Sequence, residues 1–192
     1  LFILKHIKFI NLKKTITMKN YILILLLAVF TFSCETTAPE PVDNPAAGYL
    51  STEDGRFDAR DADPANLDLW DKYIEAHNDQ NLDAIREMNA DSTQQMGSFR
   101  IFDAQGGVVD GVDAHIERLS GWFQAENPKW NTFFSYTMKV DGQVGEWVIS
   151  GHVLTRNVNG TEVSTYDIVD AYIEDGKIGA FWVYQRESVP QE

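Results

Sequence analysis

The sequence predicts an α+β domain in which three helices precede a four-stranded antiparallel sheet. Between residues 66 and 125 apolar side chains recur every three or four positions, which is typical of helices that bury one face. After Pro128 the period changes to two, and β-branched and aromatic residues dominate the strand-like runs. Because the helices come first and the strands follow as a block, we expect the helices to pack on one face of a curved sheet.

The three expected helices each carry an apolar stripe. The first follows Asp63-Pro64, a capping sequence, and is separated from the second by the polar stretch 78–81. The third spans 111–125. The stripes are Leu67, Trp70, Ile74 and His77; Leu82, Ile85 and Met88; and Val112, His115, Ile116, Leu119, Trp122 and Phe123.

The expected strands cover 131–140, 144–157, 162–174 and 178–187. A two-residue turn signal separates each pair of neighbouring runs: Asp141-Gly142, Asn159-Gly160 and Asp175-Gly176. Consecutive hairpins of this kind predict an antiparallel meander.

The N-terminal region has the pattern of an export signal. Met18 opens a short basic start, an apolar run follows, and Cys34, the only cysteine, comes directly after it. The pattern over 18–33 resembles a bacterial lipoprotein signal peptide, which implies that Cys34 is lipidated; the alternative is an ordinary signal peptide with an incidental cysteine. We interpret residues 1–17 as a misassigned upstream extension. The expected location is the cell envelope, with the protein lipid-anchored and, because Glu35 follows the cysteine, in the outer membrane.

Residues 34–65 are rich in proline and in small or acidic side chains, so we expect a flexible tether between the lipid anchor and the domain. The domain then spans 66–187, and 188–192 form a short tail. The chain carries 29 acidic and 16 basic residues, and five of the basic ones precede Cys34. Such an acidic domain argues against nucleic acid as a partner and against membrane contact other than through the lipid anchor.

Three stretches carry a family resemblance over residues 67–186. They are "WDKYIEAHNDQNLDAIREMNAD", "GVDAHIERLSGWF" and "DIVDAYIEDGKIGAFWVYQR". They resemble the nuclear transport factor 2-like superfamily, and within it the SnoaL-like and ketosteroid-isomerase-like proteins. The resemblance implies a cone-shaped fold that encloses an apolar pocket, and in many members dimerisation through the sheet.

The resemblance also implies candidate catalytic residues. In the steroid isomerases a helix tyrosine and a protonated strand carboxyl stabilise an oxyanion, while a second carboxylate moves the proton. Tyr73 matches the tyrosine and Asp170 is the best match for the strand acid. The base position falls at Met96-Gly97, where neither residue accepts a proton, which argues against ketosteroid isomerisation.

Each candidate has a packing alternative. Tyr73 could be a core tyrosine, and Asp170 acts in the pocket only if the face of Asp170, Ile168 and Tyr172 points inward. His115 lies on an apolar stripe, where it could be a general base or a packing residue. Together with His77 and His152 it shows no metal-ligand spacing, so we expect no metal site.

Aromatic residues are abundant enough to line a pocket for a ring-shaped or apolar ligand, although core and interface packing would use them equally. Trp70, Trp122, Tyr172 and Trp182 are the candidate ligand contacts. The glycines do not have the spacing of a phosphate-binding loop, and we expect no cofactor.

Two classes of function remain open. The domain could bind a small apolar or ring-bearing molecule, or serve only for association; alternatively, it could be a cofactor-free acid–base enzyme in which His115 or Asp170 moves a proton and Tyr73 stabilises an oxyanion. Neither face of the expected strands 144–157 and 178–187 is fully polar, so we expect the apolar residues on the outer side of the sheet to be covered by another surface. A homodimer is the expected solution.

Overall fold

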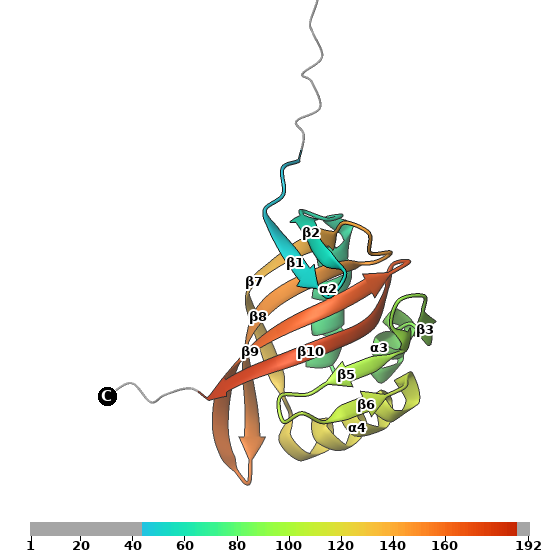
Figure 1. Ribbon diagram of the computed structural model, residues 1–192. Helices are drawn as coiled ribbons and strands as arrows, with labels where there is room; N and C mark the ends of the chain where they lie inside the picture. The colour runs from blue at the N-terminus through green and yellow to red at the C-terminus, as the bar shows by residue number, and fades with distance from the viewer. Residues whose placement is uncertain (1–43, 188–192) are drawn as a thin grey trace, which may run out of the picture. The chain divides into compact units, whose positions relative to one another are not determined.

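The computed structural model describes residues 44–187 (Figure 1). The helices are α2 (Ala65–Asn78), α3 (Leu82–Met88) and α4 (Val112–Glu126). The strands are β1 (Gly48–Thr52), β2 (Gly55–Arg60), β3 (Ser92–Thr93), β4 (Gly97–Ser98), β5 (Arg100–Phe102), β6 (Val108–Asp110), β7 (Lys129–Val140), β8 (Glu146–Val158), β9 (Thr161–Glu174) and β10 (Lys177–Glu187). Eight strands form one sheet in the order β1-β2-β7-β8-β9-β10-β5-β6, and β3 pairs with β4.

The long strands β7 to β10 form the predicted meander. Every neighbouring pair in it is antiparallel. Asn159 and Gly160 both have positive φ angles, 52° and 84°, and Asp175 and Gly176 repeat this at 52° and 70°. Tight turns of this kind match the twist of the flanking strands, which explains why the dipeptides predicted the hairpins.

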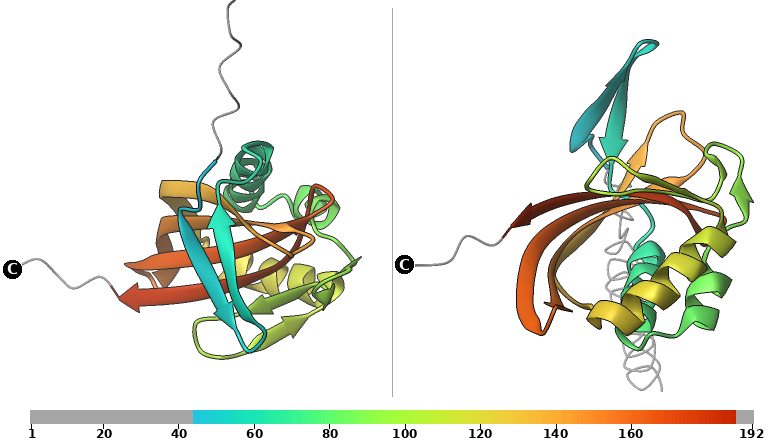
Figure 2. Two further views of the ribbon diagram at one scale, coloured as in Figure 1. Left: turned by 45° about the horizontal axis from the view of Figure 1, so that its top comes forward. Right: turned by 90° about the horizontal axis from the view of Figure 1, so that it is seen from below.

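All three helices lie on the concave side of the sheet, as the right-hand view in Figure 2 shows. The short helix α3 begins where the sequence predicted, because the Asn81 side chain accepts a hydrogen bond from the Ala84 N–H at 3.1 Å. The α+β architecture, with helices packed on a curved and mostly antiparallel sheet, is therefore confirmed.

The tether predicted over 34–65 is wrong for its C-terminal part. Strands β1 and β2 form a hairpin in five register pairs, and β2 continues onto β7 through Ala59↔Val140 and Arg60↔Lys139. Every residue of β1 is exposed. The prediction of a tether rested on the scarcity of large apolar residues in this segment. It failed because an edge hairpin is held by backbone hydrogen bonds to a free strand edge rather than by buried side chains.

Strands β5 and β6 were not predicted, since each has only three residues. β5 runs parallel to β10, with Ala180 opposite Arg100 and Trp182 opposite Phe102. This addition extends the sheet beyond the meander and places Ile101 and Val109 beside α4 in the core.

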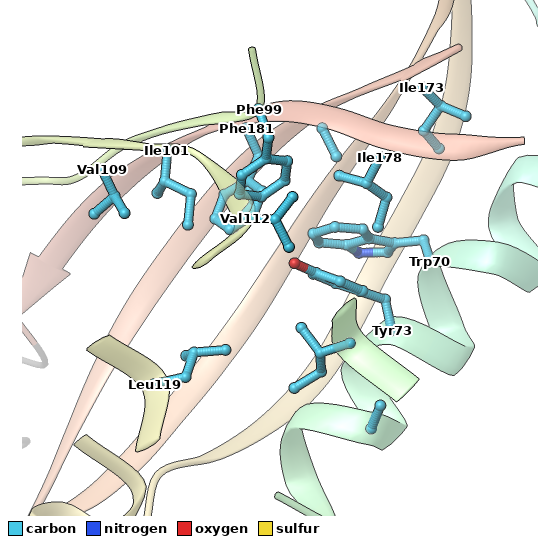
Figure 3. Packing of buried hydrophobic residues seen from close by; sticks show 14 of the residues in the cluster. Trp70, Tyr73, Phe99, Ile101, Val109, Val112, Leu119, Ile173, Ile178 and Phe181 are labelled. Carbon is cyan, nitrogen blue, oxygen red and sulfur yellow. The ribbon is translucent and has the colours of Figure 1, made fainter. Parts of the chain in front are cut away.

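The core fills the space between the helices and the concave face. In the close view of Figure 3, Trp70 and Tyr73 project from α2 toward side chains of the sheet and of α4. The buried cluster consists of Trp70, Tyr73, Ala76, Ile85, Phe99, Ile101, Val109, Val112, Leu119, Phe123, Val148, Val169, Ala171, Ile173, Ile178 and Phe181.

Several sequence predictions lie outside the described residues: the extension 1–17, the signal 18–33, the lipidated Cys34, the first part of the tether and the tail 188–192. Within residues 44–187, no helix has the length and apolar character needed to cross a membrane.

Two glycines make a matched stability test. A Cβ at Gly145 would lie 2.4 Å from the Tyr172 ring and 2.5 Å from the Ile173 carbonyl oxygen, whereas a Cβ at Gly121, within α4, would meet nothing within 4 Å. We expect Gly145→Ala to lower the free energy of unfolding by about 1–3 kcal/mol. Gly121→Ala should raise it by about 1 kcal/mol. Urea denaturation measures both, and an unaffected Gly145→Ala protein would contradict the close packing.

Candidate functional site

A cavity of about 350 Å³ lies between α2, α4 and the concave face of the sheet. Its walls are largely apolar and aromatic, with a limited set of polar side chains. The lining residues are Trp70, Tyr73, Ile74, His77, Ile101, Asp103, Ala104, Gln105, Val109, His115, Arg118, Leu119, Trp122, Trp130, His152, Leu154, Arg156, Asp167, Val169, Phe181, Val183 and Gln185. Ligand sites commonly combine apolar walls with a few convergent polar groups.

A polar row crosses the floor of the cavity. The strand register places Thr132 opposite His152, His152 opposite Asp167, and Asp167 opposite Gln185. Residues directly opposite one another in an antiparallel sheet share a face, so these four side chains, from β7 to β10, form one line across the concave side.

Asp167 is the buried carboxyl of this row, with 3% of its surface exposed. Its Oδ1 accepts hydrogen bonds from Gln185 Nε2 at 3.0 Å and from Thr165 Oγ1 at 3.1 Å. Burial raises the pKa of the Asp167 carboxyl above its ordinary value, although these two donors partly oppose the shift. A carboxyl in this setting can accept a proton or pair with a charged ligand.

His152 is fully buried, and both of its ring nitrogens are engaged by hydroxyl groups. Ser150 Oγ lies 2.8 Å from Nε2, and Thr132 Oγ1 lies 3.0 Å from Nδ1. Burial lowers the pKa of His152 to about 4, so the ring is neutral near pH 7. One hydroxyl donates to the ring and the other accepts from it, as the neutral imidazole requires.

Tyr73 and Trp70 form the aromatic wall on the α2 side, with ring centroids 5.5 Å apart (Figure 3). Tyr73 Oη and Trp70 Nε1 are buried and make no well-formed hydrogen bond within residues 44–187, although the Asn89 side chain lies near enough to the Tyr73 hydroxyl to act on its pKa. Burial raises the pKa of the Tyr73 hydroxyl well above its ordinary value, which keeps it protonated. Unpaired buried donors are costly and therefore mark a region where a ligand acceptor or a water molecule would be stabilising.

His77 and His115 complete the buried imidazoles of the wall, with ring centroids 6.0 Å apart. His77 Nδ1 lies 2.8 Å from the Tyr73 carbonyl oxygen, and His115 Nδ1 lies 3.2 Å from Asn89 Nδ2. Burial lowers the pKa of His77 to about 4 and that of His115 to about 3. His115 Nδ1 therefore accepts from the Asn89 amide, and neither ring carries charge near neutrality.

Two ion pairs flank the cavity. Arg118 Nη2 lies 2.9 Å from Asp103 Oδ2, and Arg156 Nη1 lies 3.0 Å from Glu126 Oε2. Trp122 also donates its indole N–H to Glu126, at 2.8 Å, which fixes the orientation of the Trp122 ring. Both cavity-lining arginines are thus paired with carboxylates.

The structure brings four of the predicted site residues together. Tyr73 and His115, proposed as catalytic groups, and Trp70 and Trp122, proposed as ligand contacts, all line the same cavity. Their roles remain predictions, because a position in the wall does not distinguish binding from packing.

Asp170, Tyr172 and Trp182 do not reach the cavity, so their assignment to the pocket is wrong. On β9 the cavity face carries Asp167 and Val169, and alternation turns Asp170 and Tyr172 to the opposite side. Trp182 stacks on Phe102 there, with ring centroids 4.6 Å apart. Burial raises the pKa of the Asp170 carboxyl on that outer face, where it lies close to the Tyr184 hydroxyl.

Sequence reasoning missed Asp167, Arg156 and Gln185, and considered His152 only as a metal ligand. One signal was available: Val169, Ala171 and Ile173 make a wholly apolar alternate face, and Asp167 continues it at the same spacing. Within the described residues, no group of three or more His, Cys, Asp or Glu side chains is arranged to hold a metal ion.

Comparisons with known proteins bear on the fold. No protein-family model and no curated protein matches the chain. Solved structures do match. A protein from Jannaschia sp. CCS1, assigned as a SnoaL-like polyketide cyclase, is 16% identical with a TM-score of 0.51, over 66% of this chain and 90% of that one.

Two further structures agree. A protein from Shewanella denitrificans OS-217 with the same assignment is 9% identical with a TM-score of 0.50, over 65% of this chain and 92% of that one. Bal32a, from a soil-derived mobile gene cassette, is 11% identical with a TM-score of 0.51, over 62% and 88%. At these identities the likeness concerns the fold alone, and it confirms the expected α+β fold, in which helices pack on a curved and mostly antiparallel sheet.

The buried histidines predict acid sensitivity. Because the folded pKa values lie below the ordinary value of about 6.5, their contribution to stability is complete above that pH and is lost as pH falls toward 4. As pH falls through this range, each histidine should add up to about 1.4 kcal/mol per pH unit to the decrease in the free energy of unfolding. Urea denaturation between pH 7.5 and 4.5 measures the slope. His152→Asn should reduce it by one histidine's share, and an unchanged slope would show that His152 is not held neutral.

Proposed function

We propose that this nuclear transport factor 2-like domain binds a small ring-bearing molecule in the cavity beneath its sheet. The observation that carries the proposal is the wall itself: Trp70, Trp122 and Trp130 line one cavity of about 350 Å³ together with Phe181. Flat aromatic side chains offer large contact areas to a ring, and ligand pockets of this size and composition are common.

The polar groups of the cavity support a ligand that is not purely apolar. Asp167 and Gln185 lie on its floor, and Trp70 Nε1 is a buried donor without a partner among the described residues. A few polar groups set in an apolar wall orient a ligand by hydrogen bonding while the wall provides most of the contact.

Filling the cavity should abolish binding. Val183 lines it and is only partly buried, so Val183→Trp places a large ring in the ligand space without opening the deepest core. We expect the affinity for a neutral ring compound such as N-phenyl-1-naphthylamine, measured by its fluorescence, to fall at least tenfold.

The matched control is Ile168→Trp. Ile168 is also β-branched and partly buried, but it pairs with Gly151 and Tyr184 on the outer face of the sheet. This variant should keep the wild-type affinity. Equal affinities for wild type and Val183→Trp would place the binding elsewhere, and no binding by the wild type would refute the proposal.

A second candidate is a cofactor-free acid–base enzyme, and the burial of Asp167 favours it. A carboxyl whose pKa is raised by an apolar cavity is a better proton acceptor at neutral pH than an exposed one. Asp167 replaces Asp170 in this role, while Tyr73 remains a protonated donor that could stabilise an oxyanion.

Proton exchange tests this candidate without a known substrate. A base in the cavity should speed exchange of the α-protons of a ring ketone such as 2-tetralone in heavy water, followed by proton NMR. Asp167→Asn should lose about a hundredfold or more of the acceleration. Asp170→Asn, a carboxyl on the outer face of the same strand, should lose none. Exchange equal to that in buffer would exclude this activity for such ketones.

We also propose that the domain forms a homodimer through the outer face of the sheet. Phe133, Phe134, Tyr136, Tyr166 and Tyr184 are each at least 38% exposed there. Phe133, Phe134, Tyr136 and Tyr166 form one continuous aromatic surface, because neighbouring ring centroids among them lie 5.2–6.4 Å apart. A second copy can cover such a surface by two-fold symmetry.

Light scattering on the chain from Ala46 onward tests the dimer. The wild type should have the mass of two copies at tens of micromolar, and Tyr136→Glu should dissociate it because a charge would be buried in the interface. Tyr49→Glu changes an equally exposed tyrosine, 54% against 53%, on the β1–β2 hairpin and should leave the dimer intact. A monomeric wild type with its sheet intact would contradict the proposal.

A further inference from the structure

We propose that the cavity selects an organic ammonium ion, with the protonated amine of the ligand paired to Asp167 and its ring against the tryptophans. This inference rests on the proposed binding function and adds the charge of the ligand's head group. It follows from which charges in the cavity already have partners and which one does not.

Four cavity-lining residues carry an acidic or guanidinium group: Asp103, Arg118, Arg156 and Asp167. Arg118 is paired with Asp103 at 2.9 Å. Arg156 is paired with Glu126 at 3.0 Å, and the Trp122 indole N–H, followed by the Arg156 guanidinium, holds the pKa of Glu126 below its ordinary value. Within residues 44–187, Asp167 is left as the cavity-lining charge without an ion-pair partner.

Neutral groups alone hydrogen-bond Asp167. Thr165 and Gln185 donate to Oδ1, and Oδ2 has no hydrogen-bond partner within the described residues. His152, directly opposite on β8, is neutral, and its nitrogens are engaged by Ser150 and Thr132. Burial raises the pKa of Asp167 and the charge of Arg156 partly opposes that rise, but Arg156 forms its ion pair with Glu126 rather than with Asp167. A buried carboxylate without a direct ion-pair partner is unfavourable, so a cation supplied by the ligand would be stabilised there.

The aromatic wall suits the ring of such a ligand. Trp130 on β7 lies opposite Leu154 on β8. Leu154 is two residues from His152 on the same face of β8, so the Trp130–Leu154 pair lies about 7 Å along the strands from the polar row. Trp122 packs edge-to-face on Trp130, with ring centroids 5.4 Å apart. Trp130 is two strands away from Asp167, so the ring of the ligand, rather than its ammonium group, would extend over these indoles.

The charge of the whole molecule acts in the same direction. The chain carries a formal net charge of −13 at pH 7, which attracts cations and repels anions during approach. Arg118 and Arg156 already have carboxylate partners, Asp103 and Glu126, which would compete with an anionic ligand, although Arg156 Nε is buried without a hydrogen-bond partner within residues 44–187.

Three probes with the same ring separate the possibilities: 2-naphthylmethylamine, 2-naphthylmethanol and 2-naphthoate. Calorimetric titration at pH 7 gives their affinities for the wild type, for Asp167→Asn and for the matched control Asp170→Asn, with melting temperatures to verify folding. We expect the amine to bind at least tenfold more tightly than the alcohol or the carboxylate. Asp167→Asn should remove that preference and Asp170→Asn should keep it.

The outcomes distinguish this inference from the function on which it rests. If the amine and the alcohol bind equally well, or if the preference survives in Asp167→Asn, the charge selectivity is wrong while ring binding stands. If the carboxylate binds most tightly, the arginines rather than Asp167 select the ligand. If none of the three binds at millimolar concentration, the proposed ring-binding function fails together with the inference.

Discussion

The two-residue alternation of the long strands, fixed in register across β8, β9 and β10, is the constraint on which the site depends. It places Asp167 between His152 and Gln185 on the concave side and sends Asp170 to the other side. If β9 shifted by one residue against its neighbours, Asp167 would turn to the outer face and Asp170 to the concave face. The same shift would turn Val169 and Ala171 out of the core. The apolar contacts that hold the register therefore also define the chemistry of the cavity.

The helices complete this surface mainly with bulky aromatic groups, and Arg118, the charged lining residue of α4, is paired with Asp103. His77 and His115 are buried against aromatic rings and remain neutral, so these two imidazoles add no charge to the α2 and α4 walls. In such a low-dielectric wall each remaining ionic group has a strong influence. The arginines at the edge are already paired, which concentrates the electrostatic character of the interior on Asp167.

Local sequence patterns predicted the elements well where a single element carried the signal. The stripes of α2 to α4 and the turn dipeptides of the meander were readable because helical period and turn chemistry are local properties. The facing of Asp170 was harder to predict, because Ile168 and Tyr172 share its face, and only the wholly apolar run of Val169, Ala171 and Ile173 indicated that the other face is the inner one. The edge hairpin and the three-residue strands β5 and β6 depend on partners distant in sequence, and no local pattern reports those.

The attachment of the β1–β2 hairpin has a mechanical consequence. Two register pairs join it to β7, so tension reaching Asn44 from the N-terminal side would load the hairpin before the long strands. If it opened, residues 48–60 would add a span of about 40 Å. The cavity would be undisturbed, because none of its lining residues comes from the hairpin. Opening the hairpin would therefore lengthen the N-terminal connection without moving any residue that lines the cavity.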